Sequence, residues 1–260
     1  MSISTLNETS TLKQKHEKNF HSDNNLLHFS LNKKQMSDTA LLYTFLSGLI
    51  NIGAFLACHR FVTHVTGFAT HFGADLAQFK WSEALSMLIA PLFFLFGAAL
   101  SGFFIQHQKL LGKKIQLGAI FVTLSLSHWS VVILSQFQIF GEFGLAHEAR
   151  ADFLFISILC LNAGLQNATF SSLSQNFWRT THLTGLTTDL GINITQALFH
   201  RQNPELTQLM KLRSKIILSF ILGSVMGALI FSKFHYLGFI IPAIVNTFFY
   251  FKIRKDSLKL

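Results

Sequence analysis

The sequence predicts an all-α, polytopic membrane protein with about six transmembrane helices, arranged as two three-helix inverted repeats. Each repeat is expected to carry a polar segment that is re-entrant or broken. Three observations support this. Half of the 260 residues are hydrophobic and only 13% are charged, whereas a soluble domain carries about a quarter charged residues. Several apolar runs approach the roughly 20 residues that cross a bilayer core. One thirteen-residue phrase occurs twice.

The apolar runs are uninterrupted, which favours helices over the alternating strands of a barrel. Backbone polar groups in lipid must be satisfied within the chain, and a helix does this inside one segment. The predicted spans cover residues 39–58, 83–105, 115–137, 151–173, 215–231 and 236–251.

The amino-terminal residues differ in composition from the rest. Residues 1–36 are polar and carry five lysines, so we expect a disordered, basic cytoplasmic tail. Residues 37–260 form a single transmembrane domain in this interpretation. No short apolar stretch with a small-residue cleavage site opens the chain, so the first span is expected to act as the insertion signal.

The net charge of +9 follows the predicted topology. With the amino terminus inside, 17 Lys and Arg residues lie on the inner side and four lie in external loops, as the positive-inside rule expects. We therefore expect a multi-pass protein of the bacterial inner membrane with both termini in the cytoplasm. Its partners would be the lipid bilayer and a small-molecule or ion substrate, but not nucleic acid, because no recognisable binding motif accompanies the basic residues. The oligomeric state stays open.

The repeated phrase reads "THVTGFATHFGAD" at residues 63–75 and "THLTGLTTDLGIN" at residues 181–193, with six identities at an offset of 118. Upstream, "SGLINIG" resembles "AGLQNAT" at an offset of 116, which aligns Gly48 with Gly164 and Asn51 with Asn167. Two blocks in the same order, each attached to an apolar helix, indicate an internal duplication. The repeats cover about 39–137 and 151–251. Three spans per half make the second copy enter from the opposite side, as in many secondary transporters.

The THxTG segments decide the topology. If each crossed the bilayer, the chain would have eight spans and parallel repeats, with a poorer charge split of 15 to 6. Histidine, aspartate and several threonines are costly in hydrocarbon. Thr and Gly permit close packing and local departures from helical geometry. We therefore favour a re-entrant or interfacial half-helix over a full span.

The repeated segments and the intramembrane asparagines supply the candidate substrate-binding residues. Threonine can cap a half-helix, glycine admits a neighbouring backbone, and the free amides of a helix amino terminus attract anions. Histidine exchanges protons near neutral pH, and aspartate can partner it. The candidates are Asn51, His64, Thr66, Gly67, Asp75, Asn167, His182, Thr184, Gly185 and Asp189.

A packing role competes with the binding role, because small and hydroxylated residues commonly hold membrane helices together. The sequence predicts no enzyme, no cofactor and no metal site, since HExxH, GxSxG, Walker A and GxGxxG are absent. A membrane-embedded enzyme using His64, His182 and Asp189 would need at least three convergent ligands. Three functions remain: a small-solute transporter or permease, which we favour, a structural or regulatory membrane protein, and the less favoured enzyme.

Two stretches carry a family resemblance: "FLSGLINIGAFLACHRFVTHVTGFATHFGADLA" and "LNAGLQNATFSSLSQNFWRTTHLTGLTTDLGI". They resemble the YoaK-like bacterial membrane proteins, a family catalogued as a domain of unknown function. The resemblance covers about residues 40–251, and its most specific elements are the two Thr-Gly phrases and "GLQNAT". It implies a polytopic inner-membrane protein and no particular substrate. The lysine-bearing tail lies outside it.

Overall fold

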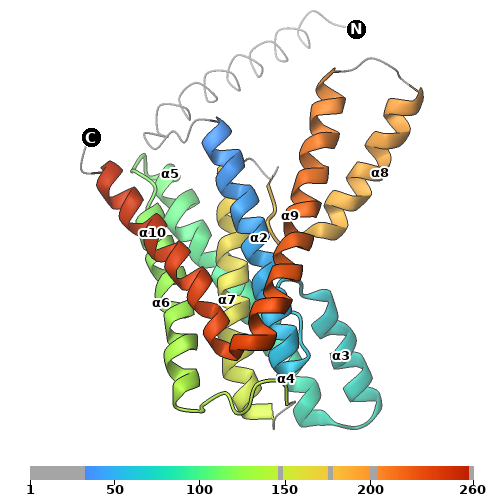
Figure 1. Ribbon diagram of the computed structural model, residues 1–260, viewed down its shortest axis with the longest axis vertical. Helices are drawn as coiled ribbons and strands as arrows, with labels where there is room; N and C mark the ends of the chain where they lie inside the picture. Colours follow the sequence, from blue (N-terminus) through green and yellow to red (C-terminus); the bar gives the residue numbers. More distant parts are fainter. Residues whose placement is uncertain (1–32, 146–148, 175–177, 200–203, 258–260) are drawn as a thin grey trace, which may run out of the picture.

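The computed structural model describes residues 33–145, 149–174, 178–199 and 204–257, and every regular element in these ranges is a helix. The helices named in Figure 1 are α2 (Lys33–Cys58), α3 (Thr66–Ala77), α4 (Trp81–Gly102), α5 (Gln108–Leu110), α6 (Leu117–Gln136), α7 (Ala149–Leu173), α8 (Leu183–Phe199), α9 (Pro204–Phe234) and α10 (Ile240–Ser257). A π-helical turn, η1 (Phe103–His107), joins α4 to α5, and a 3-10 turn, η2 (His235–Phe239), joins α9 to α10. The all-helical prediction is confirmed for the described residues.

Five helical stretches in the described ranges are long and apolar enough to cross a membrane: Gln35–Cys58, Trp81–Leu110, Leu117–Gln136, Phe153–Leu173 and Pro204–Asp256. The last contains 53 residues. As one straight helix it would measure about 80 Å, more than twice the roughly 30 Å core of a bilayer. Figure 1 shows that the chain instead turns round at η2 and that α10 runs back towards the end where α9 began. His235, with φ of 49°, terminates α9 in the left-handed conformation common at helix ends.

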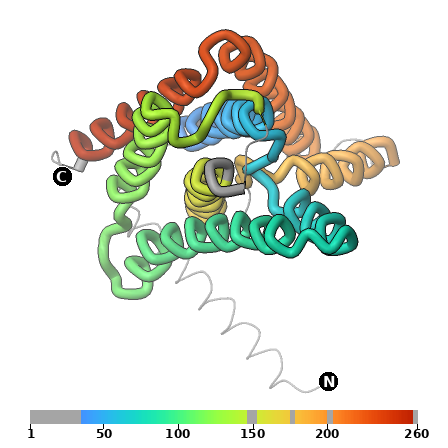
Figure 2. The backbone as a smooth tube through the Cα atoms, turned by 90° about the horizontal axis from the view of Figure 1, so that it is seen from below, coloured from blue at the N-terminus to red at the C-terminus, as the bar shows by residue number. Residues whose placement is uncertain are grey.

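Helices α2 and α7 form the inside of the bundle. In each, 67% of the most apolar window is buried, against 22% in the stretch that contains α4. Viewed along the bundle, α2 and α7 are surrounded by α4, α6, α9 and α10 (Figure 2). These two inner helices are also the first helices of the two predicted repeats.

Helix α7 packs along α4 at a close crossing made by two glycines. A Cβ added at Gly97 of α4 would clash with the carbonyl oxygen of Leu161, and one added at Gly164 of α7 would clash with the carbonyl oxygen of Phe94. Each glycine therefore lets the backbone of the other helix approach it directly. Small residues commonly serve this purpose between membrane helices.

Helix α2 packs along α9 at a second crossing of the same design. A Cβ at Gly48 of α2 would clash with the carbonyl oxygen of Phe220, and one at Gly223 of α9 would clash with that of Phe45. Gly48 of α2 lies 116 positions before Gly164 of α7. Gly97 of α4 lies 126 positions before Gly223 of α9. The first helix of each half, α2 or α7, therefore packs on the second helix of the other half, α9 or α4, at an equivalent pair of glycines.

The remaining helices follow the same scheme. Helix α3 packs on α4, α8 packs on α9, and α6 packs on α10. Figure 1 places α3 and α8 on the same side of the bundle but towards opposite ends. The last turn of α8 and the first turn of α9 lie at the end of the bundle where α2 begins and α10 ends, whereas the α3–α4 connection lies at the other end.

The helix boundaries differ from the predicted spans mainly where helices continue into polar sequence. Helix α2 begins at Lys33, inside the predicted tail, and residues 1–32 of that tail lie outside the described residues. Helix α9 begins at Pro204, eleven residues before its predicted span. Hydropathy marks the apolar part of a helix, so it does not report a charged first section such as 204–214.

Candidate functional site

The first THxTG segment returns alongside the helix that precedes it. Asn51 Oδ1 accepts hydrogen bonds from the backbone amides of Val62, at 3.1 Å, and Thr63, at 3.2 Å. Asn51 lies seven residues before Cys58, the last residue of α2, which corresponds to about 10 Å along the helix. After α2 ends, the chain therefore reverses direction and runs back alongside the last two helical turns of α2 before α3 begins.

The second segment does the same on α7. Asn167 Oδ1 accepts a hydrogen bond from the amide of Thr181 at 3.4 Å, and Asn167 lies six residues before the end of α7. The neighbouring Gln166 donates through Nε2 to Thr180 Oγ1 at 3.2 Å and to Ser47 Oγ of α2 at 2.8 Å. The aligned asparagines thus hold equivalent segments, and Gln166 ties the second segment to the other inner helix.

The two returning segments reach a common hollow between α2 and α7. It encloses about 220 Å³ of unfilled space and is lined by Ser47, Ile50, Thr63, Leu159, Asn162, Ala163, Gln166 and Thr181. Thr63 and Thr181 are equivalent residues of the repeated phrase. The hollow is narrow, with room for about one water molecule. Its lining combines hydroxyl and amide groups and carries no charge.

A buried polar network extends from this hollow towards α6. Ser127 Oγ donates to Asn162 Oδ1, and the ring of His128 lies beside Asn162, with Nδ2 to Nδ1 at 3.4 Å. His128 Nδ1 also lies 2.7 Å from the carbonyl oxygen of Leu124. Among the described residues, His128 Nε2 and Ser157 Oγ are fully buried without a hydrogen-bond partner. Helix α7 is therefore joined to α6 by polar contacts as well as by apolar packing.

The repeated histidines lie outside the hollow and pack on the glycines of their own phrase. Both imidazoles are exposed. A Cβ at Gly67 would lie 3.2 Å from Cε1 of His64, and a Cβ at Gly185 would lie 2.6 Å from Nε2 of His182. These glycines were expected to admit a neighbouring backbone. They instead make room for a histidine ring three residues earlier, which gives the recurring His-x-x-Gly spacing a local packing cause.

The prediction that Thr66 caps the start of α3 was wrong. Thr66 is the first residue of the helix, Val65 occupies the cap position, and no side chain caps the helix. Thr66 Oγ1 instead lies 3.5 Å from Nδ1 of His64. In both copies the threonine four residues later donates back along the helix, from Thr70 to the Thr66 carbonyl at 3.1 Å and from Thr188 to the Thr184 carbonyl at 3.0 Å.

The two candidate aspartates have different surroundings. Asp189 of α8 forms an ion pair of 3.0 Å with Arg213 of α9, and Arg213 also contacts Asn193 Oδ1. In the first half, the position equivalent to Arg213 is Met87. Within the described ranges, no basic group lies within ion-pair distance of Asp75. Asp189 therefore ties α8 to α9 and does not pair with a histidine of the other repeat.

A family model described as "Protein of unknown function (DUF1275)" matches residues 39–251. The chain belongs to this family. No curated protein and no solved structure matches it. Membership in DUF1275 agrees with the resemblance noted from the Thr-Gly phrases, and a narrower YoaK-like assignment stays a prediction. Together with its apolar helices, membership indicates that this DUF1275 protein is an integral membrane protein.

The hollow of this DUF1275 protein is lined by residues other than the ten predicted ones. Asn51 and Asn167 hold the segments that reach it, while the remaining eight lie on or next to α3 and α8. Sequence reasoning missed Asn162 and Gln166, although a polar side chain in an apolar helix is itself a signal. In the part of the chain that the structure describes, no three His, Cys, Asp or Glu residues gather as metal ligands.

Proposed function

We propose that this DUF1275 protein is a small-solute permease of the bacterial inner membrane, with a pathway between its two repeats. The proposal rests on one observation, the shared location of Thr63 and Thr181. These equivalent residues come from two segments that return alongside the inner helices, and both line one polar hollow. A pathway formed where two repeats meet would bring equivalent residues together in this way.

The proposed topology has six crossings, made by α2, α4, α6, α7, α9 and α10, with both termini in the cytoplasm. Helices α3 and α8 are then re-entrant half-helices that begin inside the membrane and end at opposite faces. Their positions towards opposite ends of the bundle support this arrangement (Figure 1). The two matching glycine crossings support an inverted duplication, because each half packs its second helix on the first helix of the other.

The chemistry of the hollow favours a small, neutral, polar solute. Hydroxyl and amide side chains offer both donors and acceptors, and none of the lining residues carries a charge. The space holds about one water molecule, so a larger solute can pass only when the lining moves. We expect the returning segments to move, because asparagine side chains hold their described residues to the inner helices.

The topology is tested by labelling single cysteines with a membrane-impermeant maleimide. Cysteines placed at Thr66 and Thr184, near the starts of the two half-helices, are expected to react from opposite faces of the membrane. Cysteines at Lys113 and Gln138 serve as markers for the two ends of the bundle. Labelling of both threonine positions from the same face would contradict the inverted arrangement.

Transport is tested by the swelling of proteoliposomes in urea and in glycerol, followed by light scattering. The purified protein is expected to accelerate swelling in at least one solute over protein-free vesicles. Thr63→Trp and Thr181→Trp should both abolish this gain, because each fills the hollow. Thr70→Trp, on the exposed side of α3, should leave it unchanged. Swelling no faster than in protein-free vesicles would instead support a structural or regulatory role.

A further inference from the structure

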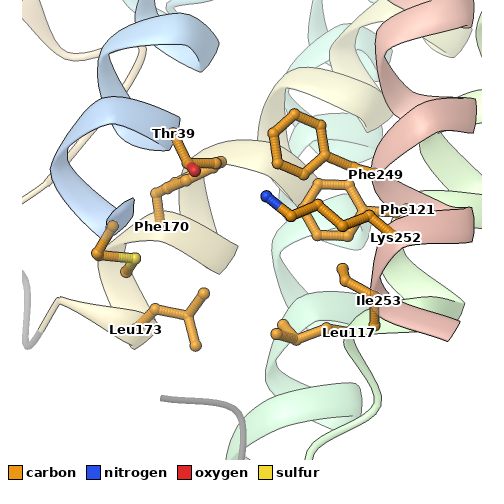
Figure 3. Close-up of a pocket in the computed structure, with 9 residues that line it drawn as sticks. Thr39, Leu117, Phe121, Phe170, Leu173, Phe249, Lys252 and Ile253 are labelled. Atoms are coloured by element: carbon orange, nitrogen blue, oxygen red, sulfur yellow. The ribbon is translucent and has the colours of Figure 1, made fainter. Parts of the chain in front are cut away.

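A second hollow lies near the end of the bundle where α2 begins and α10 ends. It is a groove between α2, α6, α7 and α10 that is open on one side, and its free space of about 380 Å³ includes this open side (Figure 3). Most of its wall is hydrocarbon, supplied by Leu117, Phe121, Phe170, Leu173, Phe249 and Ile253. The polar groups come from Thr39 and Lys252. Figure 3 shows the Lys252 side chain reaching from α10 across the hollow, with its nitrogen towards Thr39 and Phe170.

The ammonium group of Lys252 is available to an anion. Its nitrogen lies 5.7 Å from the ring centroid of Phe249. No carboxylate of the described residues lies within ion-pair distance of Lys252. Asp256 lies one helical turn after Lys252, yet it is beyond ion-pair distance.

The surroundings of the hollow are basic on balance. Arg254 and Lys255 follow Lys252 on the last turns of α10, and Lys113 and Lys114 precede Leu117 of the wall. Two carboxylates lie nearby on the same helices, those of Asp38, next to Thr39, and Asp256. The five basic residues outnumber the two acidic ones, so the segments that form the hollow carry a net positive charge next to it.

We propose that this hollow binds an anionic phospholipid, with one acyl chain against the aromatic wall and the phosphate at Lys252. Basic pockets between transmembrane helices at the cytoplasmic side suit anionic headgroups. The charge also argues against two other occupants. A second copy would bring two sets of basic segments together, and residues 1–32, with three lysines, would add positive charge to the same place. The inference does not depend on the proposed permease function.

The test uses the full chain, purified in detergent and titrated with dioleoyl phosphatidylglycerol or dioleoyl phosphatidylcholine, with bound lipid counted by native mass spectrometry. The anionic lipid is expected to bind more tightly. Lys252→Gln should weaken its binding about fivefold. Lys255→Gln, which removes a charge on the same helix outside the lining, should change it far less. Leu173→Trp fills the hollow and should reduce the binding of both lipids.

Two further measurements make the result decisive. Circular dichroism of each variant checks that it is folded, and Lys252, being exposed, is expected to tolerate substitution. Inorganic phosphate alone should not compete, because the acyl chain supplies the contact with the wall. Equal binding of the two lipids, unchanged binding in Lys252→Gln, or full competition by phosphate would each overturn the proposal.

Discussion

The close crossing of α4 and α7 makes a quantitative prediction for the variant Gly97→Ala. The new methyl group would meet backbone atoms only. It would clash with the carbonyl oxygen of Leu161 and lie 2.8 Å from the amide nitrogen of Leu165. Backbone atoms cannot rotate away as a side chain can. The helices must therefore separate by about 1 Å to restore ordinary contact distances.

This separation has a cost that can be isolated with a matched control. Overpacking of this kind costs about 1–3 kcal/mol, and alanine regains up to about 1 kcal/mol over glycine in a helix. Gly102 lies on the same helix, and a Cβ there would meet nothing within 4 Å. Gly102→Ala should therefore be neutral or slightly stabilising. The difference in unfolding free energy between the two variants reports the cost of overpacking alone.

The measurement is unfolding of the purified protein in mixed micelles with increasing dodecyl sulfate, followed by circular dichroism. Gly97→Ala is expected to be about 1–3 kcal/mol less stable than Gly102→Ala. Gly164→Ala, which strikes the carbonyl of Phe94 from the other side of the same crossing, should show a loss of similar size. Equal stability of Gly97→Ala and Gly102→Ala would refute the reasoning, because it would mean that the two helices do not approach this closely.

Three other predictions follow from the hydrogen bonds and burial. Asn51→Ala leaves two backbone amides without their acceptor, whereas Asn167→Ala leaves one at a longer distance, so the first variant should lose more stability, about 1–3 kcal/mol per orphaned group, in the same unfolding assay. Arg213→Met, which installs the residue of the first half, should cost about 1 kcal/mol or less, because the partner carboxylate is half exposed, yet it should increase proteolysis near α8. Cys58 and Cys160 are buried, so a thiol-reactive maleimide should modify them only after unfolding, as mass spectrometry would show; modification of the folded protein would contradict their placement.

The asymmetry between the halves gives α3 and α8 different attachments. Asp189 and Arg213 tie α8 to α9 by an ion pair, while the first half has His71 and Met87 at the equivalent positions. Helix α3 is also shorter than α8, with 12 residues against 17. If the half-helices move during transport, α3 is therefore expected to move more easily.

Local properties of the sequence were sufficient to identify the class of protein, and they predict an internal duplication. Apolar runs and few charges indicate membrane helices because the bilayer excludes unpaired polar groups over a known thickness. Identity between the two Thr-Gly phrases and between the two asparagine-bearing helices is visible without coordinates. The sequence could not show that α9 extends back to Pro204, because charged residues at a helix end carry no apolar signal.

The composition of the candidate site was decided by tertiary structure. Thr63 and Thr181 line one hollow because each segment reverses direction after its helix, and no periodicity in the sequence predicts such a reversal. The adjacent histidines carry more conspicuous chemistry, yet both are exposed and neither lines the hollow. Likewise, the sequence contains 16 glycines and does not show which of them lie at helix crossings. The packing of α4 on α7 and of α2 on α9 identifies the glycines at which two backbones touch, while others face open space. Contacts of this kind depend on how distant segments pack, whereas the membrane composition depends on each segment alone.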